Sequence, residues 1–344
     1  MLPRNIKIRY LNVQHWTDEK NPSLIAHLTE NDPDVILLAS TSRIREQPKI
    51  KIPSYNTFTS NKLNQRNAGS AIAIKFGIKF ELLNQFHHDT IGARIETQHG
   101  PMIILTNYTP PRQRFLPNQD IEFMIRHQTP IIFAGDMNTR HQAFGYVSSS
   151  NPKGRALNQH IVNNRLNYIG PNFPTFYTRR SQTKPDCVFT NNRIFLNYHV
   201  QPGGIGPSDH ITIDIRISAD PILVPRPPIP DIDNTDWDQY KELLSSDPLI
   251  NLDGGTADSI LNEFNKIYSS INSAKEQSTP MKTVQRRNNL KTTSKFKRLT
   301  RILDIYFRAL TRHGKTPHLE RSIRHIQSLI VQEGIQCKYE WWQR

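Results

Sequence analysis

The stretch that decides the fold is Pro130-Ile-Ile-Phe-Ala-Gly-Asp-Met-Asn-Thr-Arg-His141, in which an apolar run ends at Asp136 and Asn138. A short apolar run that stops at polar turn residues predicts a buried strand with polar groups at its end. A second such junction occurs where Gly206-Pro-Ser-Asp-His210 precedes the alternating run Ile211–Ile217. Two strand ends therefore carry groups suited to acid–base and metal chemistry.

Length and charge bound the class of protein. The chain has 344 residues and a formal net charge of +14, so we expect roughly two domains with a sizeable core. The basic excess favours an anionic polymer as partner, because Lys and Arg gain affinity by displacing phosphate counterions. A basic surface that is merely solvated is the alternative.

Cysteine usage and hydropathy indicate the compartment. The two cysteines, Cys187 and Cys337, lie far apart, which predicts a reducing compartment without a disulfide framework or a zinc knuckle. The chain has no signal-peptide pattern at its start and no run near the roughly 18 apolar residues that a membrane span requires. We therefore expect a soluble, intracellular protein.

Charge is distributed unevenly along the chain. Residues 1–218 carry a net charge of +10, residues 219–274 carry −7 and residues 275–344 carry +11. Pro221–Pro230 contains five prolines, which remove helix and sheet hydrogen bonds, so we place a boundary there. The predicted parts are a first domain at 1–218, a Pro-rich acidic linker at 219–235 and a basic helical region at 236–344. We expect the helical region to pack weakly on the first domain.

Hydrophobic patterns predict both helices and strands in the first domain, which makes it a layered α/β domain. Short apolar runs between turn residues predict these strands: Ile6–Val13, Val35–Ala39, Ser70–Phe76, Met102–Tyr108, Ile131–Ala134, Cys187–Thr190 and Ile211–Ile217. Apolar residues at three- and four-residue spacing predict these helices: Ser23–Glu30, Asp120–His127 and Arg155–Asn164. After the linker we expect no strand, and these helices: Tyr240–Leu244, Ile260–Ile271, Leu299–Leu310 and Leu319–Ile330.

Three more polar residues stand at strand ends. Asn12 ends the first predicted strand, Tyr108 ends a later one, and Asp186 precedes Cys187–Thr190. Each is weak evidence alone, because an Asn or Asp at such a place is more often a turn residue that caps the backbone. Together they supply what cleavage of a phosphodiester requires: metal ligands, a group that orients water, and hydrogen-bond donors for the phosphate.

In their order and contexts these residues resemble the endonuclease/exonuclease/phosphatase family, which includes apurinic endonucleases and pancreatic DNase. The resemblance covers about residues 5–217. Its carriers are Asn12, the strand Gly69–Lys75, Tyr108, Gly135–Asn138, Asp186 and Ser208–His210. The resemblance implies an α/β fold with a two-layered β-sandwich flanked by helices, here followed by an α-helical tail.

Within that family the sequence is similar to the endonuclease domain of jockey-type non-LTR retrotransposon polyproteins. The similar segments are Tyr108–Arg112, Gly135–His141, Asn151–Gly154 and Phe173–Phe176. The acidic linker and the basic helices resemble the region between endonuclease and reverse transcriptase in such elements. No polymerase motif follows, so we expect a fragment, a truncated or degenerate copy, or a co-opted descendant that lost its polymerase.

The resemblance also implies roles. Asp136 would orient or deprotonate the attacking water with Asn138 beside it. His210, steered by Asp186, would balance charge on the phosphoryl oxygens. Tyr108 would donate a hydrogen bond to the phosphate or the leaving group. A carboxylate beside an imidazole fixes its tautomer and raises its pKa, so the pairing is also reasonable on physical grounds.

The implied cofactor is Mg²⁺, with Mn²⁺ as the alternative, and the implied metal side contains Asn12 and Asp209. One position departs from the family. Where the family has a metal-binding Glu at the end of the strand after the first helix, this chain has Ser40. A neutral hydroxyl is a poorer ligand for Mg²⁺ than a carboxylate. We therefore expect weaker metal binding and slower cleavage.

The expected partners are DNA, RNA of the element and a reverse transcriptase region absent from this chain, with the nucleus as the site of action and no membrane contact. The basic run Lys291–Arg301 is explained equally well by a solvated helix face. The candidate nucleic-acid contacts are Arg112, Arg140, Lys184, Lys291, Lys295, Lys297 and Arg298.

Three functions follow from these observations. The first is a Mg²⁺-dependent DNA endonuclease that nicks a target strand, so that the new 3′-hydroxyl primes reverse transcription. The second is a catalytically impaired remnant that still binds nucleic acid, which Ser40 and the missing polymerase favour. The third is a phosphatase on small phosphorylated molecules, which explains the basic excess less well.

Overall fold

The structure is a computed structural model that describes most of the chain. The described residues are 5–342 with these gaps: 18–19, 42–49, 61–68, 88, 146–149, 164, 178–181, 192–196, 225–227, 246–256, 283–292 and 314–315. The chain forms two compact units, one of Met1–Val224 with Asn288–Arg344 and one of Pro225–Arg287. This division differs from the predicted boundaries near residues 218 and 235, because the last two helices group with the first 224 residues.

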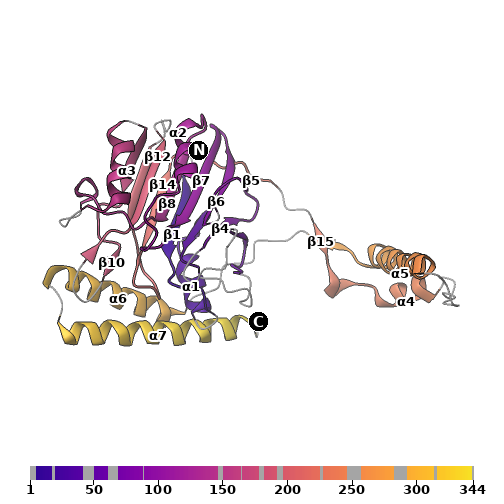
Figure 1. The fold of residues 1–344 in the computed structure, drawn as a ribbon. Helices are drawn as coiled ribbons and strands as arrows, with labels where there is room; N and C mark the ends of the chain where they lie inside the picture. Colours follow the sequence, from indigo (N-terminus) through magenta and orange to yellow (C-terminus); the bar gives the residue numbers. More distant parts are fainter. Residues whose placement is uncertain are drawn as a thin grey trace. The chain divides into compact units, whose positions relative to one another are not determined.

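Two six-stranded sheets form the body of the larger unit (Figure 1). The first sheet has the order β13 (Tyr198–Ile205), β14 (Ile211–Ile217), β1 (Ile6–Asn12), β2 (Val35–Ala39), β4 (Ser70–Lys75) and β3 (Tyr55–Thr59). The second has the order β5 (Phe80–Leu83), β6 (Thr90–Thr97), β7 (Gly100–Tyr108), β8 (Ile131–Asp136), β12 (Asp186–Asn191) and β9 (Leu166–Gly170). Within each sheet one strand pair is parallel, β1 with β2 and β7 with β8.

The main core lies between the two sheets. It joins buried residues of the first sheet, such as Ile8 and Leu37, to buried residues of the second, such as Ile104 and Val188. Strands whose side chains are buried on both faces read as continuous apolar runs, which is why these strands were predictable. The predicted α/β fold with a two-layered β-sandwich and helices is confirmed.

Helices cover the outer faces of both sheets. On the first sheet, α1 (Asn21–Leu28) buries Leu24 and Leu28. On the second, α2 (Asn118–Arg126) and α3 (Pro152–Val162) contribute to a second apolar cluster. The start of α3 is set by Asn151, whose side chain accepts a hydrogen bond from the Gly154 amide at 2.7 Å, as an N-cap residue does. The three helices predicted in this domain are confirmed, with ends that differ by a few residues.

The sequence analysis missed five of the twelve strands in these sheets: β3, β5, β6, β9 and β13. The last of them shows why. It contains Pro202, which has no amide hydrogen to donate, and Gly204 with a φ of +91°. Such residues argue against a strand, but β13 is an edge strand whose register shifts between Pro202 and Ile205. Edge strands and bulges tolerate them.

The last two helices pack firmly on the larger unit. In Figure 1, α6 (Ser294–His313) and α7 (Pro317–Trp342) run side by side. Their apolar faces share a cluster with α1 and the ends of β13 and β14. Leu303 of α6 is fully buried and Ile330 of α7 is 1% exposed. The prediction of a weakly packed tail is therefore wrong for these helices, because sequence periodicity shows an apolar face without showing what covers it.

Replacing Leu303 with alanine tests this packing. The Leu303→Ala variant should lose about 2–5 kcal/mol of unfolding free energy, the usual cost of a cavity at a buried leucine. Ile305, on the same helix and 63% exposed, provides the matched control. Urea unfolding of the full chain measures both variants. Equal effects of Leu303→Ala and Ile305→Ala would contradict the packing.

The smaller unit is a helical pair closed by a short ladder. Helix α4 (Trp237–Ser245) packs against α5 (Ala257–Ser278), and β15 (Ile229–Pro230) pairs with β16 (Met281–Lys282). The expectation of no strand after the linker is thus wrong for this two-residue ladder. A run this short gives no periodic signal. Among the described residues, no helix is long and apolar enough to cross a membrane.

Candidate active site

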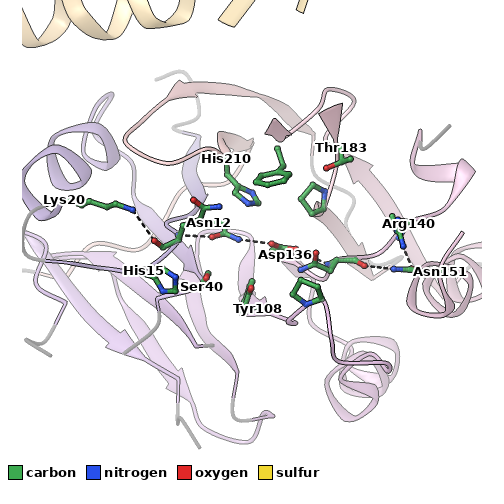
Figure 2. Close-up of a pocket in the computed structure, with 15 residues that line it drawn as sticks. Asn12, His15, Lys20, Ser40, Tyr108, Asp136, Arg140, Asn151, Thr183 and His210 are labelled. Carbon is green, nitrogen blue, oxygen red and sulfur yellow. Dashed lines mark hydrogen bonds between the residues drawn. The ribbon is translucent and has the colours of Figure 1, made fainter. Parts of the chain in front are cut away.

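A pocket of about 730 Å³ opens where strand ends of both sheets meet (Figure 2). Predicted site residues that line it are Asn12, Ser40, Tyr108, Asp136, Asn138, Arg140 and His210. Residues that the sequence analysis did not propose for a site also line it: Gln14, His15, Lys20, Pro111, Asn151, Phe176, Thr183 and Pro185.

Strand register brings the acidic residues together. Tyr108 on β7 is paired with Asp136 on the parallel strand β8, and Asp136 is paired with Asp186 on the antiparallel strand β12. Asn12 ends β1 in the other sheet, and its Nδ2 donates to Asp136 Oδ2 at 2.8 Å. The site is therefore held by the ladders of one sheet and by a side-chain bond across the two sheets.

Asp186 and His210 form a buried relay. His210 Nδ1 lies 2.7 Å from Asp186 Oδ2, and the Tyr10 hydroxyl donates to Asp186 Oδ1 at 2.7 Å. Asp186 has no exposed surface, and each of its oxygens has a partner. Because Nδ1 of His210 bonds to Asp186, the other ring nitrogen, Nε2, remains available for a different partner. Sequence reasoning missed Tyr10, because it reads as an ordinary inward-facing strand residue.

Charge on His210 is favoured by its neighbours. Burial works to lower the pKa of His210, but the Asp186 carboxylate and its hydrogen bond outweigh burial and raise that pKa to about 9. The imidazole is therefore a cation at neutral pH. The Phe176 ring lies against it, with ring centres 4.7 Å apart. The ring is thus fixed by Asp186 on one edge and by an aromatic face.

Asp136 is buried in the pocket wall and sensitive to charge. Burial, and then the nearby Asp186, raise the pKa of Asp136 to about 7, while His210 and two hydrogen bonds oppose the rise. Those bonds come from Asn12 Nδ2 and from the Asn138 amide, which donates to Asp136 Oδ1 at 3.0 Å. Asn138 has a φ of +49°, a left-handed conformation that Asn adopts more readily than most residues. The turn thereby aims its amide at the carboxylate.

Tyr108 and Ser40 face the same pocket. Burial, and then Asp136, raise the pKa of Tyr108 to about 12, and a hydrogen bond with Ser40 acts against that rise. The phenol therefore keeps its proton at neutral pH and can donate it in a hydrogen bond. Ser40 is 4% exposed with a φ of +54°. The hydroxyl thus lies in the pocket wall, at the position for which the family resemblance implies a carboxylate.

One group of side chains could hold a metal ion. Asp136, Asp186 and His210 each offer a ligand atom, and these atoms lie within 4.8 Å of one another. This set differs from the predicted metal side of Asn12, Asp209 and Ser40. Two of its members, Asp186 and His210, already bond to each other, and a protonated His210 repels cations.

On the predicted metal side, Asp209 Oδ1 lies 4.0 Å from His210 Nε2. Asp209 Oδ1 is buried and has no hydrogen-bond partner among the described atoms. Burial raises the pKa of the Asp209 carboxyl, although His210 and other partners lower it in part. Mg²⁺ prefers carboxylate oxygens as ligands, together with water and phosphate oxygens. The donor chemistry of Asp209 and Asn12 therefore fits such an ion, with only a hydroxyl at Ser40.

Basic residues lie around the pocket and on α6. Arg140 lines the pocket, and its amide donates to Asn151 Oδ1 at 3.0 Å. Arg112 is exposed and Lys184 is half-buried, but neither lines the pocket. Lys297 and Arg298 are exposed on α6, whereas Lys295 Nζ pairs with Glu333 Oε2 at 2.8 Å. Lys291 lies outside the described residues. The roles of all the predicted site residues stay predictions.

A lysine beside the pocket was missed by the sequence analysis. Lys153 is only 3% exposed, and its Nζ donates to Pro110 O at 3.2 Å. Burial lowers the pKa of Lys153 to about 8, although Asp136 acts in the opposite direction. The similar segment Asn151–Gly154 contains Lys153, but it gave that side chain no role, since a lysine in a first helical turn normally faces solvent.

Part of the chain is similar to known proteins. Residues 102–214 match a family model described as endonuclease-reverse transcriptase. The RNA-directed DNA polymerase from mobile element jockey of Drosophila funebris is 22% identical over 197 residues, which is 55% of this chain. The chain spans about a fifth of that relative, 21% of its length.

A solved structure shares the fold. The endonuclease domain of TRAS1, a telomere-specific non-LTR retrotransposon, is similar with a TM-score of 0.51 and 17% identity. The similarity covers 61% of this chain and 97% of that one. The site described above therefore lies in a fold shared with a solved endonuclease domain.

Proposed function

We propose that the nuclease-like part of the chain, which is similar to the endonuclease–reverse transcriptase family model and to proteins of the mobile elements jockey and TRAS1, is a Mg²⁺-dependent DNA endonuclease. It would nick one strand of a target and leave a 3′-hydroxyl that primes reverse transcription. The observation that carries the proposal is the buried relay of Tyr10, Asp186 and His210 beside Asp136 at one pocket.

The chemistry assigned to the residues follows from their protonation. Asp136, held by two donated hydrogen bonds, accepts the proton of the attacking water when it is ionised. The His210 cation stabilises the charge that develops on the phosphoryl oxygens, a large effect where water is excluded. Tyr108 keeps its proton and donates a hydrogen bond to the phosphate. Asn138 fixes the direction of Asp136 through its amide.

The proposed cofactor is Mg²⁺, held by Asp209 and Asn12 together with waters, with the Asp136, Asp186 and His210 group as the other candidate set. A bound divalent cation would neutralise phosphate charge and help the leaving oxygen. Ser40 offers only a hydroxyl, so we propose that metal affinity is low. This position is the reason to consider a second function.

That second candidate is an impaired remnant that binds DNA without cutting it, and the neutral Ser40 hydroxyl in the pocket favours it. DNA is the partner in either case. The proposed contacts are Arg140 in the pocket, Arg112 and Lys184 nearby, and the exposed cations of α6. RNA of the element, a reverse transcriptase region and action in the nucleus are further parts of the proposal.

Nicking of supercoiled plasmid by the full chain tests these functions. The endonuclease should convert supercoiled plasmid to open circles with Mg²⁺ and leave it intact with EDTA. An impaired remnant should bind the plasmid, with an affinity that falls as salt rises, and cut it under neither condition. A chain that neither binds nor cuts DNA, but hydrolyses small phosphate esters, would overturn both.

A further inference from the structure

The loop that carries His210 is held at both ends by one apolar cluster. It connects β13 to β14, and its flanking residues Ile205 and Ile211 are 6% and 8% exposed. Both belong to the cluster that α6 and α7 complete. The α6 members are Phe296 and Leu303, and the α7 members are Ile323, Ile326 and Ile330. The last two helices therefore share one apolar cluster with the two residues that bracket this loop.

A second route runs from α7 to the same loop through α1. Gly334 of α7 lies so close to α1 that an added Cβ would be 2.8 Å from the Ser23 amide nitrogen. Four residues along α1 from Ser23, His27 Nε2 lies 2.6 Å from Thr212 Oγ1, just after the loop. An added Cβ on Gly206 at the start of the loop would be 2.6 Å from His27 Cδ2. A displacement of α7 relative to α1 should therefore also displace the loop, because the contacts along this route are close.

The two helices are also fixed to each other. Glu333 of α7 is 7% exposed, and it accepts from the Thr293 hydroxyl at 2.5 Å, just before α6. It also pairs with Lys295 of α6 at 2.8 Å. A buried carboxylate whose oxygens each have a partner fixes one arrangement, because losing a partner would leave a buried charge unpaired.

Resting on the proposed nuclease function, we propose that α6 and α7 brace the His210 loop and so position the imidazole against Asp186 and the substrate phosphate. The helical pair is then a working part of the nuclease rather than a tether to whatever follows it. Ile205, Ile211, His27 and Gly334 are positioning residues, since they act through the loop and do not touch the pocket. A nucleic acid bound to the exposed cations of α6 would contact the helix that holds the catalytic loop.

The test uses Gly334→Ala in the full chain. The added methyl meets backbone atoms of Ser23, which cannot turn aside, so α7 must shift away from α1. Alanine is otherwise the better helix former, so the substitution should not destabilise the helix itself. Ser328→Ala, at an exposed position of α7, is the matched control. Ile330→Val, a milder change in the shared cluster, serves if Gly334→Ala does not fold.

Two measurements decide the outcome. Amide hydrogen exchange of residues 205–213 should quicken at least about tenfold in Gly334→Ala and remain unchanged in Ser328→Ala, a local opening that exchange detects. The kcat of plasmid nicking should fall at least about tenfold with KM nearly constant. Unchanged exchange in the loop, while α7 itself exchanges faster, would overturn the brace. Hydrogen exchange of the loop can be measured even if the wild type does not nick DNA. The experiment therefore distinguishes a wrong proposal about α6 and α7 from a wrong proposal about the nuclease function.

Discussion

Plasmid nicking should disappear in the Asp136→Ala variant and in the His210→Ala variant, while DNA affinity changes little. Both side chains meet the reacting phosphate in the proposed mechanism, whereas affinity comes mainly from cations that contact the DNA backbone. Loss of a base or of a charge-stabilising group costs about 10²–10⁴-fold in rate. Initial rates of open-circle formation at saturating DNA measure the loss. Fluorescence anisotropy of labelled duplex in EDTA measures binding.

Folding must be separated from chemistry in these variants. Both residues are buried, so each variant needs a urea unfolding curve beside the nicking assay. Glu81 is exposed on β5 outside the pocket, and Glu81→Ala should nick as the wild type does. Nicking that survives in a folded Asp136→Ala or His210→Ala protein would place the chemistry elsewhere or reveal a contaminating nuclease.

The pH dependence of nicking should be bell-shaped. Asp136, with a pKa raised to about 7 by burial and Asp186, must lose its proton to accept one from water. The rate should therefore rise as pH passes about 7. Although burial opposes it, Asp186 raises the pKa of His210 to about 9, and the rate should fall as this cation is lost. The two pKa values of this profile belong to Asp136, Asp186 and His210 together rather than to single residues, because these groups lie close to one another. A rate that is level from pH 6 to pH 10 would contradict these protonation states.

A strand was predictable where its own sequence is enough to identify it. Strand β8 is buried along all of its length, so its sequence is a continuous apolar run, and Asp136 at its end marks the site. Asn12 and Tyr108 were found as the ends of predicted strands, His210 as the residue before one, and Ser40 through the family resemblance, and all four line the pocket. The sequence therefore predicted seven of the fifteen residues that line the pocket.

Contacts between distant segments were not predictable. Tyr10 reaches Asp186 across 176 positions of the chain, and nothing in an alternating strand distinguishes it from a core tyrosine. The same holds for Lys153, which was missed because it is buried against its usual tendency. The docking of α6 and α7 depends on apolar residues of α1, β13 and β14, and an amphipathic pattern on one helix does not identify its partner. The sequence alone does not show which apolar faces of the helices and strands pack against each other.

The second large effect is expected from Ser40→Glu. The new carboxylate would enter the pocket wall beside Tyr108 and Asp136, at the position where the family resemblance implies a metal ligand. Nicking should become about ten- to a thousandfold faster and should saturate at lower Mg²⁺, the scale by which electrostatic groups at reacting centres alter rates. In the Ser40→Gln variant the new side chain has nearly the same size as glutamate but carries no charge, so this variant should show no such gain in rate. Rates across a Mg²⁺ titration compare the three proteins.

Stability provides a second measurement of the same carboxylate. Ser40 is 4% exposed, so a glutamate there buries a charge beside Asp136, and without metal the variant should unfold at a lower temperature than the wild type. Adding Mg²⁺ should raise its midpoint more than that of the wild type, because a ligand that binds only the folded state stabilises it by mass action. If the wild type already nicks as fast as Ser40→Glu at the same Mg²⁺, the Ser40 hydroxyl is no defect and another ligand completes the site. If neither protein nicks but the midpoint of Ser40→Glu responds to Mg²⁺, the carboxylate restores metal binding without restoring catalysis, and the impaired remnant becomes the better account.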